Sequence, residues 1–252
     1  MSSEALKGKT ALVSGASKGI GLACAQSLAA DGANIVITAR RAGELETARD
    51  RLRVANPDVR VEICQADACE EEQVKRALAL AHEIPGKLGM LVSVVGEPVF
   101  QPILERDLQS VRRELDINFI SAFLLIRHGA PLLGRGGSIA CVSSISSVKS
   151  SYGLGVYGAA KAALERFVRA AAFELGGAGI RINAVRPGMT LPPERAETPE
   201  FAKMVAASVA ATPLGRYGQP EDVARVVRFL VGPEAGWVTG QAFSADGGQE
   251  QD

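Results

Sequence analysis

The sequence is poor in the residue types that build metal sites. Its 252 residues include two histidines and four cysteines, and the cysteines lie far apart, at Cys24, Cys64, Cys69 and Cys141. Zinc sites use closely spaced Cys and His ligands, so we predict no metal site. Cys24 and Cys141 stand in apolar runs and are expected to be small buried hydrophobic residues.

The chain also lacks an excess of charge of either sign, with 28 Lys plus Arg against 28 Asp plus Glu. This balance does not favour a nucleic-acid partner or an anionic membrane surface. The opening residues "MSSEALKGKT" have no apolar stretch of the kind found in secretory signals. No apolar run approaches the roughly 18 residues of a membrane span. We therefore predict a cytoplasmic protein in a reducing compartment.

What the chain does have is a regular alternation of short apolar runs and longer helical patterns. Hydrophobic residues make up 47% and charged residues 22%, as in soluble globular proteins. Strands are expected at 10–15, 34–39, 59–67, 88–96, 137–144, 180–188 and 241–248. Helices are expected near 19–31, 43–55, 70–83, 107–133, 155–177 and 220–231.

Strands that are apolar throughout and separated by helices predict a parallel sheet covered on both faces. The fold class is therefore α/β, with a seven-stranded parallel sheet in a single doubly wound Rossmann-type domain over 1–252. The segment 187–219 is rich in proline and small residues and follows the carboxyl end of a strand. Ligands bind at that edge of open α/β sheets, so we predict that 187–219 is a substrate lid.

A glycine-rich turn, "SGASKGIG", joins the first strand to the first helix and contains Gly15, Gly19 and Gly21. Glycines allow a tight turn and close approach to a pyrophosphate, which the helix N-terminus attracts. The spacing differs from that of a nucleoside-triphosphate loop. Dinucleotide binding is favoured over a purely structural turn, with Ser17, Lys18 and Ile20 as further contacts.

The second strand ends in "TARR", which places Arg40 and Arg41 where NAD-binding folds usually offer a carboxylate. Together with Lys18 these cations suit a 2′-phosphate, so NADP(H) is favoured over NAD(H). The alternative is that both arginines are solvated loop residues. Asp67, after the third strand, either accepts a hydrogen bond from the adenine amino group or caps the next helix with Glu70.

Tyr157 and Lys161 are four residues apart in "VYGAAKAALERF" and share a helix face. An ammonium beside a phenol lowers its pKa, which suits a proton donor; the alternative is an ordinary solvated helix face. Ser144, after the fifth strand, is placed to hydrogen-bond a substrate carbonyl or belongs to a polar loop. Asn118 is polar within an apolar stripe, and either holds neighbouring backbone together or anchors a water near Lys161.

Seven motifs in order give the chain a wider resemblance. They are "SGASKGIG", "DIN" at 116–118, "VSS" at 142–144, "YGAAK" at 157–161, "RPGMT" at 186–190, "GQPEDVA" at 218–224 and "VTGQAFSADGG" at 238–248. With them the whole chain resembles the short-chain dehydrogenase/reductase family, most of all its bacterial 3-oxoacyl-[acyl-carrier-protein] reductases. The resemblance implies a homotetramer that moves hydride between a nicotinamide and a carbonyl or secondary alcohol.

The resemblance also implies roles for residues. Tyr157 would be the general acid/base, Lys161 would lower its pKa and hold the nicotinamide ribose, Ser144 would position the carbonyl, and Asn118 would hold a proton-relay water. The implied cofactor-binding residues are Gly15, Ser17, Lys18, Gly19, Ile20, Gly21, Arg40, Arg41, Asp67, Ala68, Val95, Gly96, Tyr157, Lys161, Pro187, Gly188 and Thr190.

The chain departs from the family pattern at two places. Ser93-Val94-Val95-Gly96 stands where the family usually has Asn-Asn-Ala-Gly, so side-chain hydrogen bonds near the adenosine are lost. Pro192 stands where a threonine commonly binds the nicotinamide carboxamide, and Thr190 comes two residues earlier.

We expect an NADP(H)-dependent oxidoreductase that reduces a ketone such as a 3-oxoacyl thioester. An acyl carrier protein is the implied partner in that case, with Arg135 as a cation near the mouth of the active site. The alternatives are an NAD-dependent alcohol or sugar dehydrogenase of the same family and a catalytically weak cofactor-binding partner or sensor subunit, which the altered "SVVG" suggests.

Overall fold

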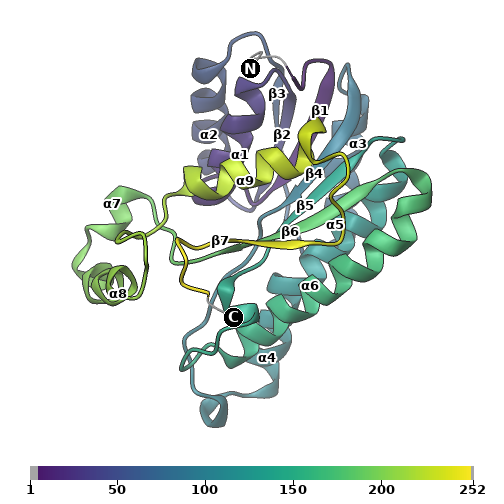
Figure 1. Cartoon of the computed structure of the whole chain (residues 1–252). Coiled ribbons are helices and arrows are strands. Elements are labelled where there is room, and N and C mark those ends of the chain that lie inside the picture. Colours follow the sequence, from purple (N-terminus) through teal and green to yellow (C-terminus); the bar gives the residue numbers. More distant parts are fainter. Residues whose placement is uncertain (1–4, 251–252) are drawn as a thin grey trace.

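A seven-stranded parallel sheet forms the centre of the protein (Figure 1). The computed structural model describes residues 5–250. The strands are β1 (Lys9–Ser14), β2 (Asn34–Ala39), β3 (Val61–Gln65), β4 (Lys87–Ser93), β5 (Ser138–Val142), β6 (Arg181–Pro187) and β7 (Ala242–Ala245). Their order is β3-β2-β1-β4-β5-β6-β7, and every neighbouring pair is parallel. The predicted fold class is confirmed.

Helices cover both faces of the sheet and bury a separate apolar core on each. One core lies under α1 (Gly19–Ala30), α2 (Ala42–Ala55) and α9 (Pro220–Val231). The other lies under α3 (Glu71–Glu83), α5 (Ser121–Gly129) and α6 (Gly155–Leu175). Because β1, β4 and β5 are buried on both faces, their sequences are apolar without alternation. Short 3₁₀ turns occur at Ile103–Glu105, Ala130–Leu132, Ile145–Ser147, Gly176–Ala178 and Pro233–Ala235.

The helix predicted over 107–133 is not continuous. It consists of α4 (Leu108–Leu115), one π-helical turn (Asp116–Ile120) and α5, followed by a 3₁₀ turn. The side chain of Asn118, in the middle of the π turn, donates to the backbone carbonyl of Glu114 at 2.9 Å. A side chain that bonds to the backbone competes with regular helix geometry, and π turns are frequent at functional sites.

The segment 187–219 contains two helices that the sequence did not predict, α7 (Pro193–Ala196) and α8 (Pro199–Ala210). Each begins with proline at its first position, where proline is favoured because its missing N–H is not needed. Both helices stand out from the body of the molecule (Figure 1). Gln249, in the tail after β7, donates to Ser208 Oγ at 2.8 Å and to Thr212 Oγ1 at 2.7 Å. The tail therefore tethers the end of α8.

Within residues 5–250, no helix is long and apolar enough to cross a membrane. In the same part of the chain, no group of three or more His, Cys, Asp or Glu side chains is arranged to hold a metal ion. All four cysteines are free, and Cys24 and Cys141 are buried, as expected for small hydrophobic residues; Cys64 is buried as well.

Candidate active site

A cleft opens at the carboxyl ends of β1, β2, β3 and β4. The predicted cofactor-binding residues that line it are Gly15, Ser17, Lys18, Arg40, Arg41, Asp67, Ala68, Val95 and Gly96. Gly19, Ile20 and Gly21 form the first turn of α1 beside it. Val94 also lines the cleft, and its backbone N–H donates to the carbonyl of Ser14 at 3.1 Å. The unusual "SVVG" thus keeps the backbone of the cleft in place.

The glycine turn brings α1 unusually close to β1. A Cβ atom at Gly21 would lie 2.2 Å from the carbonyl oxygen of Gly15, so only glycine fits there. The N-cap residue of α1, Lys18, makes no side-chain hydrogen bond to the first turn. The N–H groups of that turn therefore face the cleft without a side-chain cap, and a pyrophosphate is the kind of group that binds them.

The cleft contains a carboxylate that the sequence reasoning missed. Glu44, in the first turn of α2, accepts hydrogen bonds from Arg41 Nε at 2.6 Å and from Ser17 Oγ at 3.0 Å. Lys18 Nζ lies 3.9 Å from the same carboxylate. The hydrogen bond from Arg41 holds the pKa of Glu44 below its usual value, so this carboxylate is ionised. The signal in the sequence was the i,i+3 spacing of Arg41 and Glu44 at a helix start.

Asp67 forms a local turn. Its Oδ1 accepts from the backbone N–H of Cys69 at 2.9 Å, whereas α3 begins at Glu71, after Glu70, without a side-chain cap. The alternative in which Asp67 caps this helix with Glu70 is therefore wrong, because the Asp67 side chain bonds to Cys69, and it is the Asp67 N–H that donates to Gln73 Oε1 of α3, at 2.9 Å. Asp67 lies in the wall of the cleft, and contact with adenine stays a prediction.

The catalytic candidates come together at the carboxyl edge of β5 and the start of α6. Lys161 lies one helical turn after Tyr157, and its Nζ is 5.8 Å from the centre of the Tyr157 ring. The Lys161 side chain is fully buried, and its Nζ donates to the carbonyl of Val142 at 2.9 Å. Ser144 lowers the pKa of Tyr157, and its hydroxyl accepts from the backbone N–H of Ser146 at 3.1 Å.

The electrostatics differ from the expectation that Lys161 lowers the pKa of Tyr157. Burial raises the pKa of Tyr157, the hydrogen bond with Ser144 lowers it, and the negative charge of Glu114 raises it again. Burial lowers the pKa of Lys161 from 10.5 to about 8. The expected effect is absent here because the ammonium bonds to the Val142 carbonyl instead of the phenol. The phenol consequently stays protonated at neutral pH.

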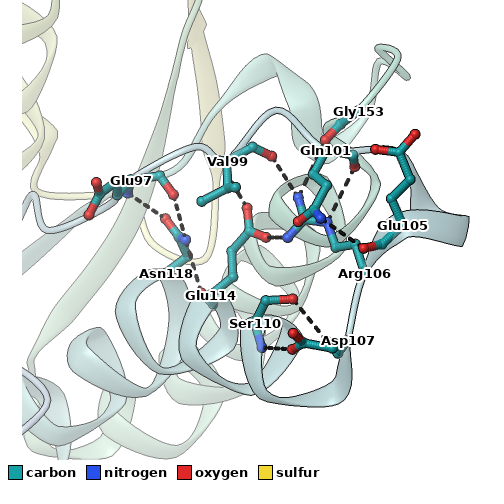
Figure 2. A network of polar contacts seen from close by, with 10 residues as sticks. All are labelled: Glu97, Val99, Gln101, Glu105, Arg106, Asp107, Ser110, Glu114, Asn118 and Gly153. Atoms are coloured by element: carbon teal, nitrogen blue, oxygen red, sulfur yellow. Dashed lines mark hydrogen bonds and ion pairs between the residues drawn. The ribbon is translucent and has the colours of Figure 1, made fainter.

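Asn118 holds neighbouring backbone together, which was one of its two predicted roles (Figure 2). Its Oδ1 accepts from the N–H of Glu97 at 2.9 Å, and its Nδ2 donates to the carbonyl of Glu97 at 3.0 Å. A Cβ atom at Gly96 would lie 2.8 Å from Lys161 Nζ and 3.1 Å from Asn118 Oδ1. Glycine at this position therefore leaves room for the Asn118 amide and the Lys161 ammonium to lie against the backbone that follows β4.

Three predicted positions lie at the end of β6 or just after it, and none of them lines the cleft. Pro187 ends the strand and Gly188 follows it, while the hydroxyl of Thr190 donates to the carbonyl of Gly188 at 3.0 Å. Their contact with a cofactor stays a prediction. Arg135 precedes β5, so it lies at the amino edge of the sheet, opposite Ser144 and Tyr157. Within one chain it is not a cation at the mouth of the site, and that expectation is wrong.

Comparison with known proteins agrees with this arrangement. Residues 15–250 match a family model described as enoyl-(acyl carrier protein) reductase. An uncharacterized oxidoreductase of Methylorubrum extorquens is 37% identical over 96% of this chain and 98% of its own length. The chain belongs to the short-chain dehydrogenase/reductase family. As a short-chain dehydrogenase/reductase it is an NAD(P)-dependent oxidoreductase.

Other members of the short-chain dehydrogenase/reductase family are similar in sequence or structure. A tropinone reductase homolog of Arabidopsis thaliana is 34% identical over 96% of this chain and 92% of its own. A short-chain dehydrogenase of Burkholderia cenocepacia, solved in complex with NADP, has a TM-score of 0.90 and 31% identity. That comparison covers 98% of this chain and 99% of the other.

Proposed function

We propose that the protein reduces a ketone with NADPH as the hydride donor. The observation that carries the proposal is the group of Ser144, Tyr157 and Lys161, of which Ser144 and Lys161 are buried, together with a cleft lined by Lys18, Arg40 and Arg41. The Tyr157 phenol is protonated at neutral pH, so it can serve as the general acid in carbonyl reduction. The NADP complex of the similar Burkholderia cenocepacia protein supports the choice of cofactor.

The residues present fit a dinucleotide. The uncapped first turn of α1, behind Gly15, would hold the pyrophosphate, and Arg40 and Lys18 would hold the 2′-phosphate. Bound NADPH supplies a hydride to the carbonyl carbon. Lys161, whose ammonium lies under the strand end at Gly96, would hold the nicotinamide ribose.

The chain's own groups handle the proton. The Ser144 hydroxyl donates a hydrogen bond to the carbonyl oxygen, which becomes more negative as the reaction proceeds. The Tyr157 phenol transfers its proton to that oxygen, so that the alcohol forms. Lys161 then returns a proton to the tyrosinate, and a water held beside Asn118 resupplies it from solvent. Because Asn118 is hydrogen-bonded to the loop after β4, its position is fixed, and a water bound to it would be held in a defined place.

The substrate is proposed to be a medium-sized, partly apolar ketone. A Cβ atom at Gly155 would lie 3.2 Å from Cδ1 of Ile103, so Ile103 packs against the start of α6, two residues before Tyr157. Ile103 and Phe100 are both exposed on this side. Exposed apolar groups beside a polar reaction centre suit such a ketone, and a 3-oxoacyl thioester is one candidate. The position of Arg135 gives no support to docking of an acyl carrier protein within one chain.

The proposed reaction is tested by following NADPH absorbance with a panel of ketones and acetoacetyl thioesters. We expect turnover with at least one ketone of the panel. Binding of NADPH without turnover on any carbonyl would contradict the proposal and favour a sensor or a non-catalytic partner subunit.

Cofactor preference gives a second test, because Glu44 competes with a 2′-phosphate for Arg41, Ser17 and Lys18. Glu44→Gln should raise the affinity for NADPH at least about threefold, since the competing negative charge is gone, and leave that for NADH within twofold. Arg40→Ser should lower NADPH affinity about tenfold, the scale of one charge-assisted hydrogen bond. Titration by cofactor fluorescence measures both. Equal changes for NADH and NADPH would contradict a 2′-phosphate site here.

We also propose a homotetramer in a reducing compartment such as the cytoplasm. Phe173 on α6 and Trp237 before β7 are 91% and 100% exposed, and large exposed apolar side chains support association of subunits. The four free cysteines support the reducing compartment. Light scattering in solution should give a mass four times that of the chain.

A further inference from the structure

A buried ion pair lies next to the catalytic group but takes no part in the reaction proposed above. The side chains of Arg106, before α4, and Glu114, near its end, are 2% and 1% exposed, and Arg106 Nη1 donates to Glu114 Oε2. Two charges removed from water destabilise a protein unless their hydrogen-bonding groups are satisfied. The remaining hydrogen bonds of the two side chains therefore decide whether the buried pair is tolerated.

The remaining groups of Arg106 bind the backbone of two loops (Figure 2). Arg106 Nη2 donates to the carbonyl oxygens of Val99 at 2.6 Å and Gly153 at 3.4 Å, and Nε donates to that of Gln101 at 3.3 Å. The N–H of Gln101 also donates to the carbonyl of Gly153 at 3.0 Å. One guanidinium therefore joins the loop that follows β4 to the loop that precedes α6.

Glu114 connects the same loop to the catalytic group. Its Oε1 accepts from the N–H of Val99 at 3.2 Å, and its backbone carbonyl accepts from Asn118 Nδ2 at 2.9 Å. Asn118 in turn holds both backbone groups of Glu97. The loop after β4 is thus fixed at two points, at Glu97 by Asn118 and at Val99 by the ion pair (Figure 2).

We propose that Arg106 and Glu114 are positioning residues that clamp the loop 97–106 against the start of α6 and so set the shape of the ketone site. The clamp holds Phe100 and Ile103, exposed apolar residues that lie next to Gly153 and Gly155 at the start of α6. This proposal rests on the proposed function, since the site it shapes is the ketone site. Removing the clamp should weaken substrate binding much more than the chemical step, because Ser144 and Lys161 are held by other contacts.

The test uses the double variant Arg106→Met/Glu114→Leu, which replaces the ion pair by an apolar pair and leaves no unpaired buried charge. We expect KM for the ketone to rise at least about tenfold, kcat to fall less than threefold, and NADPH affinity to stay within twofold. Arg106→Lys keeps a positive charge beside Glu114 but loses the planar guanidinium that bonds to both loops, so it should give an intermediate KM. Arg228→Met, on α9, breaks the ion pairs of Arg228 with Asp31 and Glu234; it is the control and should leave KM unchanged.

Hydrogen exchange gives a readout that does not need activity. Neither substitution removes the acceptor of the Gln101 amide, so its exchange should accelerate, at least about tenfold, only if the two loops separate. A double variant with wild-type KM overturns the proposal, and so does one that keeps the Gln101 amide protected. If the wild-type protein reduces no ketone, the proposed function fails, and the exchange rate of Gln101 alone decides whether the clamp exists.

Discussion

Replacing Tyr157 by Phe is expected to lower the turnover number for ketone reduction at least about a hundredfold, the scale of a lost general acid. The variant keeps the ring that lies 5.8 Å from Lys161 Nζ and removes only the phenolic hydroxyl. The protein should therefore fold and bind NADPH as before. Steady-state rates at saturating ketone, together with a cofactor titration, measure the two effects separately.

Tyr152→Phe is the matched control for Tyr157→Phe. Tyr152 lies five residues earlier, and its side chain is 87% exposed, so loss of its hydroxyl should leave turnover within twofold. If Tyr157→Phe keeps near-normal turnover, the proton comes from another group and the assignment of the general acid is wrong.

Lys161→Met is expected to abolish most activity while making the cofactor-free protein more stable. The fall in the pKa of Lys161 from 10.5 to about 8 corresponds to about 3 kcal/mol of unfavourable burial of its charge. Methionine has a similar shape and no charge, so the free energy of unfolding should rise by about 1 to 3 kcal/mol at pH 7. Turnover should fall at least about a hundredfold, because the proton supply to Tyr157 is lost.

The stability difference should depend on pH in a defined direction. Below pH 8 the lysine is protonated in both the folded and the unfolded state, so the advantage of Lys161→Met is constant. Between pH 8 and about 10.5 the unfolded state holds the extra proton, so wild-type stability rises with pH and the advantage shrinks. Denaturant unfolding at several pH values measures this. Lys75→Met, at an exposed position on α3, is the control, and an advantage that grows with pH would contradict the buried charge.

The sequence was sufficient to predict the strands and the helices that have strong apolar periodicity. Runs such as "TALVSG" and "NIVITA" are buried on both faces, and their composition alone identifies them. The break at Asp116–Ile120 was not predictable in the same way, because it depends on bonds from Asn118 to Glu97, 21 residues earlier. Helices α7 and α8 were missed because their prolines suggested a loop, although proline is favoured at a helix start.

For the site, local spacing predicted the pairs that share one helix or one turn. Tyr157 and Lys161 are one helical turn apart, and the glycine turn is contiguous in sequence. The hydrogen bond of Glu44 to Ser17 spans 27 residues, and that of Arg106 to Gly153 spans 47, so no local pattern contains them. The direction in which the pKa of Tyr157 shifts could not be predicted either. It depends on the burial of the phenol and on which group accepts the hydrogen bond of Lys161.

The tether between the tail and α8 has a consequence for the order in which the protein is assembled during synthesis. Gln249, which holds Ser208 and Thr212, lies beyond the last strand, whereas Ser144, Tyr157 and Lys161 precede it by more than eighty positions. A nascent chain on the ribosome can therefore complete its nucleotide cleft and reaction centre before α8 is fastened. Residues that are synthesised after the sheet thus fix a helix that stands out from the body of the molecule.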